Sequence, residues 1–306
     1  MTTRVVAEGI TLCDLHHMQS PEGIATALLE TADGVVIIDP GPTSTLGHLH
    51  DALRDAGSRL EDVKHIVLTH IHLDHAGASG TLVAQDPTRL VYVHERGATH
   101  MADPSRLLRS AARLYGDRME PLWGEFRPVP ASSLRPLTGG ESLKFGRRVL
   151  RVEYTPGHAQ HHISVLDERS GTAFVGDTCG EQLPSGTPVI PTVPPPDIDL
   201  ALLAGSITRI RAWGAERLFL THFGPVQPVS AYLDAHDAVL ARWAALVLAS
   251  FDAEGSDDDK ADAFADARLD ELRAGSTPEG AALLRRPPIR DCWFGLARYL
   301  RSQVPG

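Results

Sequence analysis

The 306-residue sequence has 42% hydrophobic residues and a formal net charge of −10 at pH 7. This length allows one large domain or two smaller ones, and the acidic balance argues against a dedicated nucleic-acid surface. No apolar run approaches the ~20 residues that span a bilayer, and residues 1–5 lack the apolar region of a signal peptide. Three widely spaced cysteines do not indicate a disulfide framework, so we expect a cytoplasmic protein; they are Cys13, Cys179 and Cys292.

Apolar strand-like runs and helical patterns alternate through the first hundred residues. A turn at Asp33-Gly34 separates two of the runs, and Gly57 ends a helix that begins near Ser44 or Thr45. Such alternation predicts a sheet packed with helices. We predict strands over residues 5–15, 24–30, 35–39, 66–69 and 89–93, and helices over 45–56 and 76–85.

Residues 98–127 interrupt this alternation with a helical insertion. Apolar residues recur there at helical spacing, and three arginines mark the opposite face of the helix. Helix packing explains Tyr115 and Trp123 in this segment, but either could instead line a substrate pocket. The apolar positions are Leu107, Leu108, Ala111, Leu114 and Tyr115, and the arginines are Arg106, Arg109 and Arg113.

The strand pattern returns after residue 141 and gives way to helices after residue 228. The proline-rich segment 180–196 predicts an irregular loop, and Asp257-Asp258-Asp259 is either a solvated break or a helix start. We expect a first domain over 1–228 and a helical extension over 229–306 that packs on it. The predicted strands are 143–145, 149–154, 163–166, 173–175 and 217–221, and the predicted helices include 199–213, 232–250 and 289–303.

The most informative stretch is residues 70–75, where three histidines and an aspartate follow a short apolar strand. Imidazole and carboxylate groups suit borderline metal ions such as Zn²⁺. The alternative is a polar loop that happens to be rich in histidine. The fixed spacing and the possible partners elsewhere in the chain favour a metal site, with His70, His72, Asp74 and His75 as its first ligands.

This His-x-His-x-Asp-His pattern resembles the metallo-β-lactamase superfamily, and further motifs match that family in order. They are "VVIIDPG" with Asp39, "TPGHAQHH" with His158, "GDT" with Asp177 and "LTHFGP" with His222. The resemblance implies an α/β fold, a four-layer αβ/βα sandwich, here with extra C-terminal helices. It also implies two divalent ions, most often zinc, with iron or manganese as alternatives. His70, His72 and His158 would then hold the first ion, and Asp74, His75 and His222 the second, with Asp177 bridging both.

Among the activities of this superfamily, the sequence is similar to the glyoxalase II and lactonase branch. The resemblance implies a hydrolase that uses a metal-bridging hydroxide to cleave an ester, thioester or lactone of a small molecule, with Asp74 orienting the hydroxide or carrying a proton. The alternative is an oxidoreductase similar to the mononuclear iron persulfide dioxygenases, which would leave Asp74, His75 and His222 without metal. A catalytically silent binding module is disfavoured because every ligand position is filled.

Other residues near the motifs could support this site. Asp39 matches the family's strand-end aspartate and could either orient a ligating histidine or cap the following turn. His162 could brace the site or pack in the core, and no role is predicted for His161. Thr69 and Thr221 precede ligands and should make backbone-fixing hydrogen bonds. Cys179 is expected to be a small buried residue.

The substrate cannot be identified from these motifs, although we expect a small molecule and neither nucleic acid nor membrane as partner. Arg285, Arg286 and Arg290 lie in a region similar to the one where glyoxalase II enzymes bind glutathione, but the tail does not match that pattern, and a solvated arginine cluster is the favoured interpretation. The insertion, the loop 180–196 and the C-terminal helices should wall the metal site. Tyr115 and Phe223 are the first candidates for substrate contacts, and a homodimer is possible.

Overall fold

The first half of the chain forms a mixed sheet. The structure, a computed structural model, describes residues 3–183 and 186–303, apart from the side chains of residues 286 and 287. Within this range the seven-stranded sheet begins with an antiparallel meander and continues with three parallel pairings. Its spatial order is β1 (Thr3–Ala7), β2 (Ile10–Asp14), β3 (Ala25–Thr31), β4 (Gly34–Ile38), β5 (Val63–Val67), β6 (Leu90–His94) and β7 (Leu134–Leu137).

The second sheet has six strands in the described residues and is antiparallel except between β11 and β12. Because β11 and β12 run parallel, their carboxyl ends meet at one edge of this sheet. The spatial order is β13 (Gly224–Val226), β12 (Arg217–Leu220), β11 (Thr172–Gly176), β10 (Ile163–Asp167), β9 (Arg148–Tyr154) and β8 (Ser142–Phe145).

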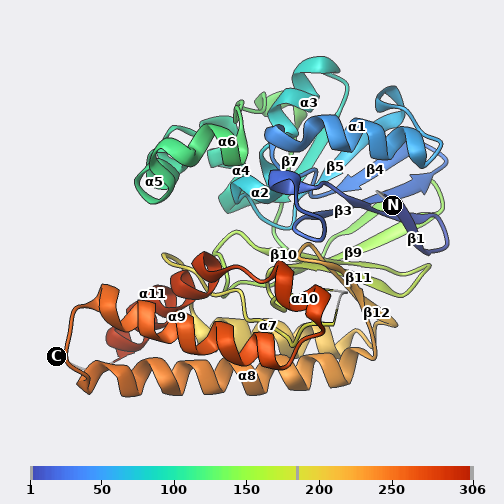
Figure 1. Ribbon diagram of the computed structural model, residues 1–306. Coiled ribbons are helices and arrows are strands. Elements are labelled where there is room, and N and C mark those ends of the chain that lie inside the picture. The colour runs from blue at the N-terminus through green and yellow to red at the C-terminus, as the bar shows by residue number, and fades with distance from the viewer. Residues whose placement is uncertain (1–2, 184–185, 304–306) are drawn as a thin grey trace.

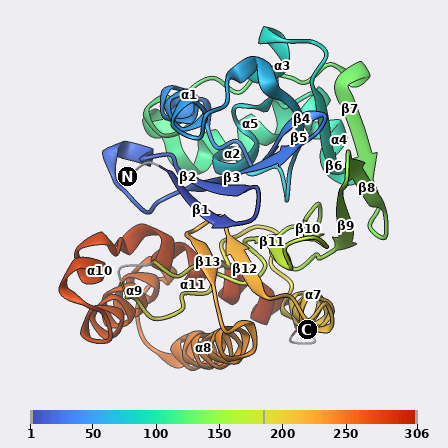
Figure 2. The same ribbon diagram turned by 90° about the vertical axis from the view of Figure 1, so that its right-hand side faces the viewer.

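Helices cover the outer faces of both sheets, so the molecule has four layers (Figures 1 and 2). The predicted αβ/βα sandwich with additional C-terminal helices is therefore confirmed. On the seven-stranded sheet lie α1 (Leu46–Asp55), α2 (Leu73–Ala76), α3 (Ser79–Gln85) and α4 (Glu95–Ala102). The insertion helices α5 (Ser105–Tyr115) and α6 (Met119–Trp123) extend to the left of this sheet in Figure 1. On the other side lie α7 (Leu200–Ala212), α8 (Val229–Ala249), α9 (Asp257–Ala274), α10 (Pro278–Leu283) and α11 (Arg286–Gln303).

Strand β4 shows how the sequence produces these layers. All four of its apolar residues are buried, and they alternate between two hydrophobic clusters. Val36 and Ile38 face the space between the sheets, whereas Val35 and Ile37 pack against the helices. A strand covered on both faces reads as a continuous apolar run, which is why the segment Val35–Ile38 shows no polar alternation.

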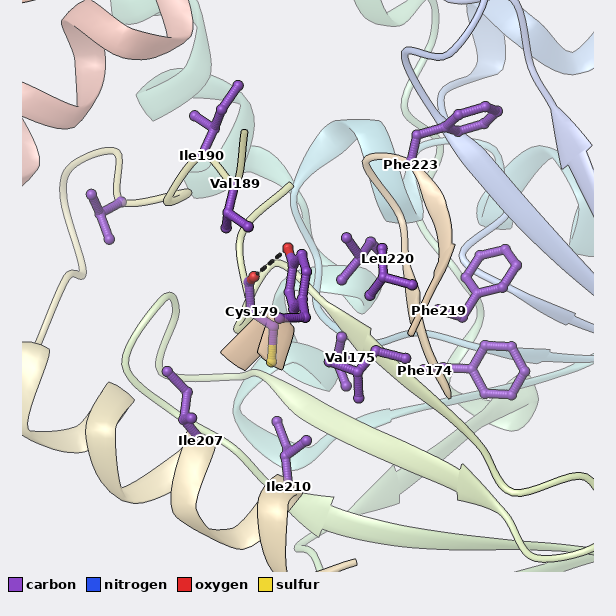
Figure 3. Packing of buried hydrophobic residues seen from close by; sticks show 14 of the residues in the cluster. Phe174, Val175, Cys179, Val189, Ile190, Ile207, Ile210, Phe219, Leu220 and Phe223 are labelled. Atoms are coloured by element: carbon purple, nitrogen blue, oxygen red, sulfur yellow. Dashed lines mark hydrogen bonds between the residues drawn. The ribbon is translucent and has the colours of Figure 1, made fainter. Parts of the chain in front are cut away.

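The C-terminal helices share the core of the second sheet. Trp243 of α8, Phe264 of α9 and Trp293 of α11 belong to the same buried cluster as the inter-sheet residues. Figure 3 shows part of this cluster around Cys179, whose backbone carbonyl accepts a 2.9 Å hydrogen bond from the Tyr232 hydroxyl of α8. We therefore propose that residues 229–306 are an extension of the domain formed by residues 1–228. Among the described helices, none combines the length and apolarity of a membrane span.

Several elements differ from the expected ones. The single strand predicted over residues 5–15 is a hairpin, because Gly9, at φ +63°, makes a tight turn with Ala7 opposite Ile10. The helix predicted over 76–85 is interrupted, since the Ala78 N–H donates to the carbonyl of Gly41 at 2.8 Å instead of continuing the helix. The acidic run at residues 257–259 begins α9, where Ser256 and Asp259 form a capping box.

Candidate metal centre

The histidine-rich segment leaves the carboxyl end of β5 and enters the short helix α2. His70 and His72 lie in the connection, and Asp74 and His75 lie in the helix itself. His70 and His75 are fully buried, so these polar rings depend on partners inside the protein. Four of the predicted ligands therefore lie close together in the segment 70–75 that follows β5.

The other three predicted ligands come from the second sheet. His158 lies in the connection between β9 and β10, Asp177 follows β11, and His222 follows β12. Because β11 and β12 are parallel neighbours, Asp177 and His222 emerge at the same edge. The structure thus brings all seven predicted ligands together at one end of the sandwich, where both sheets present strand ends.

The seven side chains form two adjoining groups that could each hold a metal ion. One contains His70, His72, His158 and Asp177, and the other contains Asp74, His75 and His222, with donor atoms within 4.8 Å of one another in each group. In the first group, His72 Nδ1 lies 2.9 Å from His70 Nε2 and 3.1 Å from His158 Nε2. In the second, Asp74 Oδ2 lies 3.3 Å from His222 Nε2 and 3.7 Å from His75 Nε2.

Asp177 faces both groups with different oxygens. Its Oδ2 lies 3.5 Å from His158 Nε2, whereas its Oδ1 lies 3.3 Å from His75 Nε2 and 3.6 Å from His222 Nε2. One carboxylate is therefore positioned between the two sets of imidazoles.

These donors fit metal ions better than they fit one another. Within the described part of the chain, His75 Nε2 and Asp177 Oδ1 are buried and have no hydrogen-bond partner, which is unusual for buried polar atoms. Ligand atoms ~2.1 Å from a tetrahedral ion lie roughly 3.4 Å apart, close to the separations observed here. The two groups thus have the chemistry and the spacing of metal sites.

Asp39 orients His75 of the second group from the buried side of the site. It follows β4 in a left-handed conformation, at φ +51°, and its side chain is 1% exposed. Its Oδ2 accepts hydrogen bonds from His75 Nδ1 at 2.9 Å, from the Thr69 hydroxyl at 2.7 Å and from the Thr221 hydroxyl at 3.1 Å. Its Oδ1 accepts the Thr69 N–H at 2.8 Å. Asp39 thereby fixes the ring of His75 so that Nε2 points into the site.

Backbone carbonyls orient two further imidazoles. His158 Nδ1 lies 2.9 Å from the carbonyl of Thr192 in the proline-rich loop, and His222 Nδ1 lies 2.7 Å from the carbonyl of Gly23. Each ring therefore carries its proton on Nδ1 and turns Nε2 toward the other donors. Asp14 fixes the loop before Gly23, because its carboxylate accepts the backbone N–H groups of His16 at 3.0 Å and Glu22 at 2.9 Å.

Two histidines outside the ligand set also pack against the site. His162 is fully buried, and its Nε2 accepts the Asp177 N–H at 3.3 Å, so it braces the proposed bridge. His161, for which no role was predicted, stacks on His70 with ring centroids 6.1 Å apart. Space here is tight: a Cβ on Gly176 would lie 2.6 Å from both His162 Nε2 and Thr69 Oγ1.

Burial and charge divide the histidines into two kinds in the metal-free chain. Burial lowers the pKa of His70 well below the ordinary value and lowers that of His72 to about 3, so both rings are neutral and ready to bind a cation. Burial also acts to lower the pKa of His222, but the carboxylates of Asp177 and Asp74 outweigh it and raise the pKa to about 9. Without metal, a proton on the second group replaces part of the missing positive charge.

Sequence reasoning missed Glu181 in the loop after Asp177. Burial raises the pKa of Glu181 to about 7, and this carboxyl also interacts electrostatically with His222, Asp177 and Asp74. A backbone bridge between Glu181 and Ile190 holds it there, and such a bridge has no signal in a proline-rich sequence.

Other candidate residues have structural surroundings. Cys179 is fully buried, as expected of a small core residue, and Phe223 is 5% exposed within the same hydrophobic cluster. Arg290 hydrogen-bonds to Asp262 at 2.6 Å and also to Asp258, both on α9. Arg285 is exposed, and the side chain of Arg286 lies outside the described residues.

Residues of the three segments expected to wall the metal site line one cleft together, and the residues that line it do not include a proposed metal ligand. A cavity of about 490 Å³ is lined by Leu114 of the insertion, Pro195 of the loop 180–196 and six residues of α11. Tyr115, next to Leu114, packs edge to face on Trp123 with ring centroids 5.2 Å apart. Burial, and then the carboxylates of Asp74 and Asp291, raise the pKa of the Tyr115 phenol.

Known proteins have the same fold. The structure of the metallo-β-lactamase family protein TTHA1429 from Thermus thermophilus superposes with a TM-score of 0.74 and 24% identity, over 98% of this chain and 95% of that one. The metallo-β-lactamase fold-containing protein ST1585 of Sulfurisphaera tokodaii is 29% identical over 195 residues, which are 63% of this chain and 70% of that protein.

A curated enzyme is also related to part of the chain. The hydroxyacylglutathione hydrolase of Legionella pneumophila (strain Corby) is 26% identical over 157 residues, half of this chain and 46% of that enzyme. The family model described as the metallo-β-lactamase superfamily matches residues 20–222, which contain all seven predicted ligands. More than half of the chain is covered by this match, and the protein therefore belongs to the metallo-β-lactamase superfamily.

Proposed function

We propose that the protein is a metal-dependent hydrolase that cleaves an ester, thioester or lactone bond in a small molecule. The observation that carries this proposal is the pair of adjoining donor groups, with His75 Nε2 and Asp177 Oδ1 buried and unpartnered among the described residues. The similarity to a hydroxyacylglutathione hydrolase supports it, because hydroxyacylglutathione is a thioester.

In this proposal each group holds one divalent ion. His70, His72 and His158 would hold the first ion, Asp74, His75 and His222 would hold the second, and Asp177 would contribute to both. Two bound ions would supply a nucleophile at neutral pH and polarise the scissile carbonyl. The proposal includes zinc as the usual ion, with iron or manganese as alternatives.

The protein's own residues then orient and move protons. Asp39 keeps the His75 ring aligned, and His162 keeps the Asp177 backbone in place. The Asp74 side chain is 23% exposed, against 5% for Asp177, so Asp74 is the carboxylate that a substrate can reach. We assign it the role of orienting the nucleophile and passing a proton toward the leaving group.

The alternative oxidoreductase, a mononuclear iron persulfide dioxygenase, would need only the first group. The second group favours the dinuclear hydrolase, since it brings Asp74, His75 and His222 together with donor atoms within 4.8 Å of one another. The proposal also includes a cytoplasmic location and a possible homodimer, which cell fractionation and light scattering test.

Metal analysis of the wild type and of His222→Ala separates the two activities. In the hydrolase this substitution removes one ligand of the second ion, so the metal content should fall from two toward one. Hydrolysis of a panel of thioesters and lactones should then fall by orders of magnitude. His48→Ala, which changes a histidine outside both groups, is the matched control and should change neither quantity.

The opposite result is equally clear. A wild type that binds a single iron, together with a His222→Ala variant that binds it equally well and keeps its activity, would refute the dinuclear hydrolase.

A further inference from the structure

The cleft between α5 and α11 has one wall from each of two segments that lie far apart in the sequence. Figure 1 shows both helices on the same side of the molecule. The insertion contributes Leu114, and α11 contributes the apolar Phe294 and Ala297 together with four charged residues. Its volume of about 490 Å³ lies in the range of small-molecule sites.

Two of the three arginines that line this cleft are paired with aspartates of α9, and the third is not. Arg290 is paired with Asp258 and Asp262, and Arg301 is paired with Asp257. Arg298 is exposed, and within the described chain it forms no ion pair. The cleft therefore presents an uncompensated guanidinium, although the protein as a whole has a net charge of −10.

A second unpaired arginine lies just after α5, outside the residues that line the cleft. Arg118 follows α5, is exposed and has no ion-pair partner among the described residues. It interacts electrostatically with both Tyr115 and Asp291, so it lies close to the mouth of the cleft. Asp291 is the carboxylate of the cleft, and burial raises its pKa.

The order of residues along α11 gives the cleft a direction. Asp291 and Arg298 are seven residues apart, so they share one face of the helix about 10 Å apart. Cys292, next to Asp291, donates to the carbonyl of Pro191 at 3.4 Å, and the carbonyl of the following residue, Thr192, holds the proposed ligand His158; this places the Asp291 end toward the metal groups. Phe294 and Ala297 lie between the two charged residues and supply an apolar stretch.

We propose that this cleft binds the substrate of the proposed hydrolase, and that this substrate is a thioester or ester with an apolar chain and an anionic group about 10 Å from the Asp291 end of the cleft. Arg298 binds the anionic group, a carboxylate or a phosphate, and Arg118 adds to its attraction. This inference rests on the proposed function for the reaction, but the binding of the anion requires only the cleft.

Kinetics with three kinds of thioester test the proposal in the metal-loaded enzyme. One probe has a neutral acyl chain on a phosphate-bearing thiol such as coenzyme A, one has an acyl chain ending in a carboxylate on N-acetylcysteamine, and one is neutral throughout. At least one anionic probe should have a KM about tenfold lower than the neutral probe. A lower KM for the coenzyme A probe would place the anionic group of the substrate on the thiol part, and a lower KM for the carboxylate probe would place it on the acyl part.

Arg298→Gln should then raise the KM of the preferred anionic probe about tenfold and leave kcat and the neutral probe within about twofold. Arg118→Gln should have a smaller effect in the same direction. The control is Arg147→Gln, which removes the same charge from the exposed β8–β9 turn. The β8–β9 turn is a suitable place for the control because it packs on the β3–β4 turn at Asp33. Asp33 precedes β4, whereas Asp39, which supports the metal groups, follows the other end of that strand.

A binding measurement separates a failure of this inference from a failure of the proposed function. Calorimetry with the free products of the two anionic probes, coenzyme A and the dicarboxylate, needs no turnover. If no probe is hydrolysed but one anion binds and Arg298→Gln weakens it about tenfold, the cleft assignment stands and the hydrolase fails. Equal KM values for all probes, or anion binding that Arg298→Gln does not change, would overturn the cleft assignment.

Discussion

Replacing Asp39 by Asn tests whether the second donor group is held in place from beneath. The buried carboxylate accepts four hydrogen bonds that join the ends of β4, β5 and β12. An asparagine of the same shape keeps one acceptor oxygen but places an NH₂ group against a donor, and it removes the negative charge that supports His75. We expect the ring of His75 to lose its fixed orientation.

The magnitude follows from the role of such partners. Loss of an oxygen that orients a ligating histidine typically weakens metal affinity 10–100-fold, which corresponds to about 1.4–2.8 kcal/mol. The second ion should therefore bind about 10–100-fold more weakly in Asp39→Asn. The first ion should lose less, because Asp39 reaches His70 only through the Thr69 hydroxyl, which lies 3.1 Å from His70 Nδ1.

Competition with a fluorescent zinc chelator measures both dissociation constants, and elemental analysis counts the ions. Asp51→Asn is the matched control, since Asp51 is an exposed carboxylate that pairs with Arg54 on α1. Circular dichroism shows whether each variant is folded. Two ions bound by Asp39→Asn with wild-type affinity would refute this account of the site.

Two further substitutions test buried charges. Arg148 is 2% exposed, donates to Asp167 at 2.5 Å and bonds the carbonyls of Glu8 and Gly9 on the other sheet. Arg148→Met leaves a buried carboxylate unpaired, so urea unfolding should show a loss of about 3–5 kcal/mol; a loss below about 1 kcal/mol would contradict this. Burial raises the pKa of Glu181 from 4.5 to about 7. Between these two values the folded, metal-free protein retains a proton that the unfolded chain releases. The stability of the fold therefore falls as the pH rises from about 4.5 to about 7. We expect chelator-treated Glu181→Gln to be more stable than wild type by about 1–3 kcal/mol at pH 8 and equal to it at pH 4; partial exposure of the side chain reduces the difference expected from the pKa alone. The same difference in stability at both pH values would count against a role of this carboxyl.

The positions of the proposed ligands could be predicted from the sequence because each follows a short apolar strand. Strand ends of parallel neighbours meet at one edge, so Asp177 and His222, which follow β11 and β12, converge once the strands are recognised. Asp39 could be found in the same way, as a carboxylate directly after the apolar run of β4. The four-layer arrangement followed from the family resemblance and the alternation of strands and helices.

What could not be predicted depends on contacts between distant segments. Strand β7 contains Pro136, which is tolerated only because β7 is an edge strand of its sheet. The arginine at position 290 forms ion pairs with α9 that no local pattern reveals. The support of His222 by the Gly23 carbonyl likewise joins segments 199 residues apart.

The proposed ligands are divided between the two sheets, with His70 to His75 on one and His158, Asp177 and His222 on the other. Ions held by both would cross-link the layers without a covalent bond, and the unfolded chain has no such site. By thermodynamic linkage, each ion at a free concentration 100 times its Kd would add about 2.7 kcal/mol to the stability of the fold. Resistance to heat and to proteolysis would then follow the supply of metal in the surroundings, and chelation would loosen first the edge where the sheets meet.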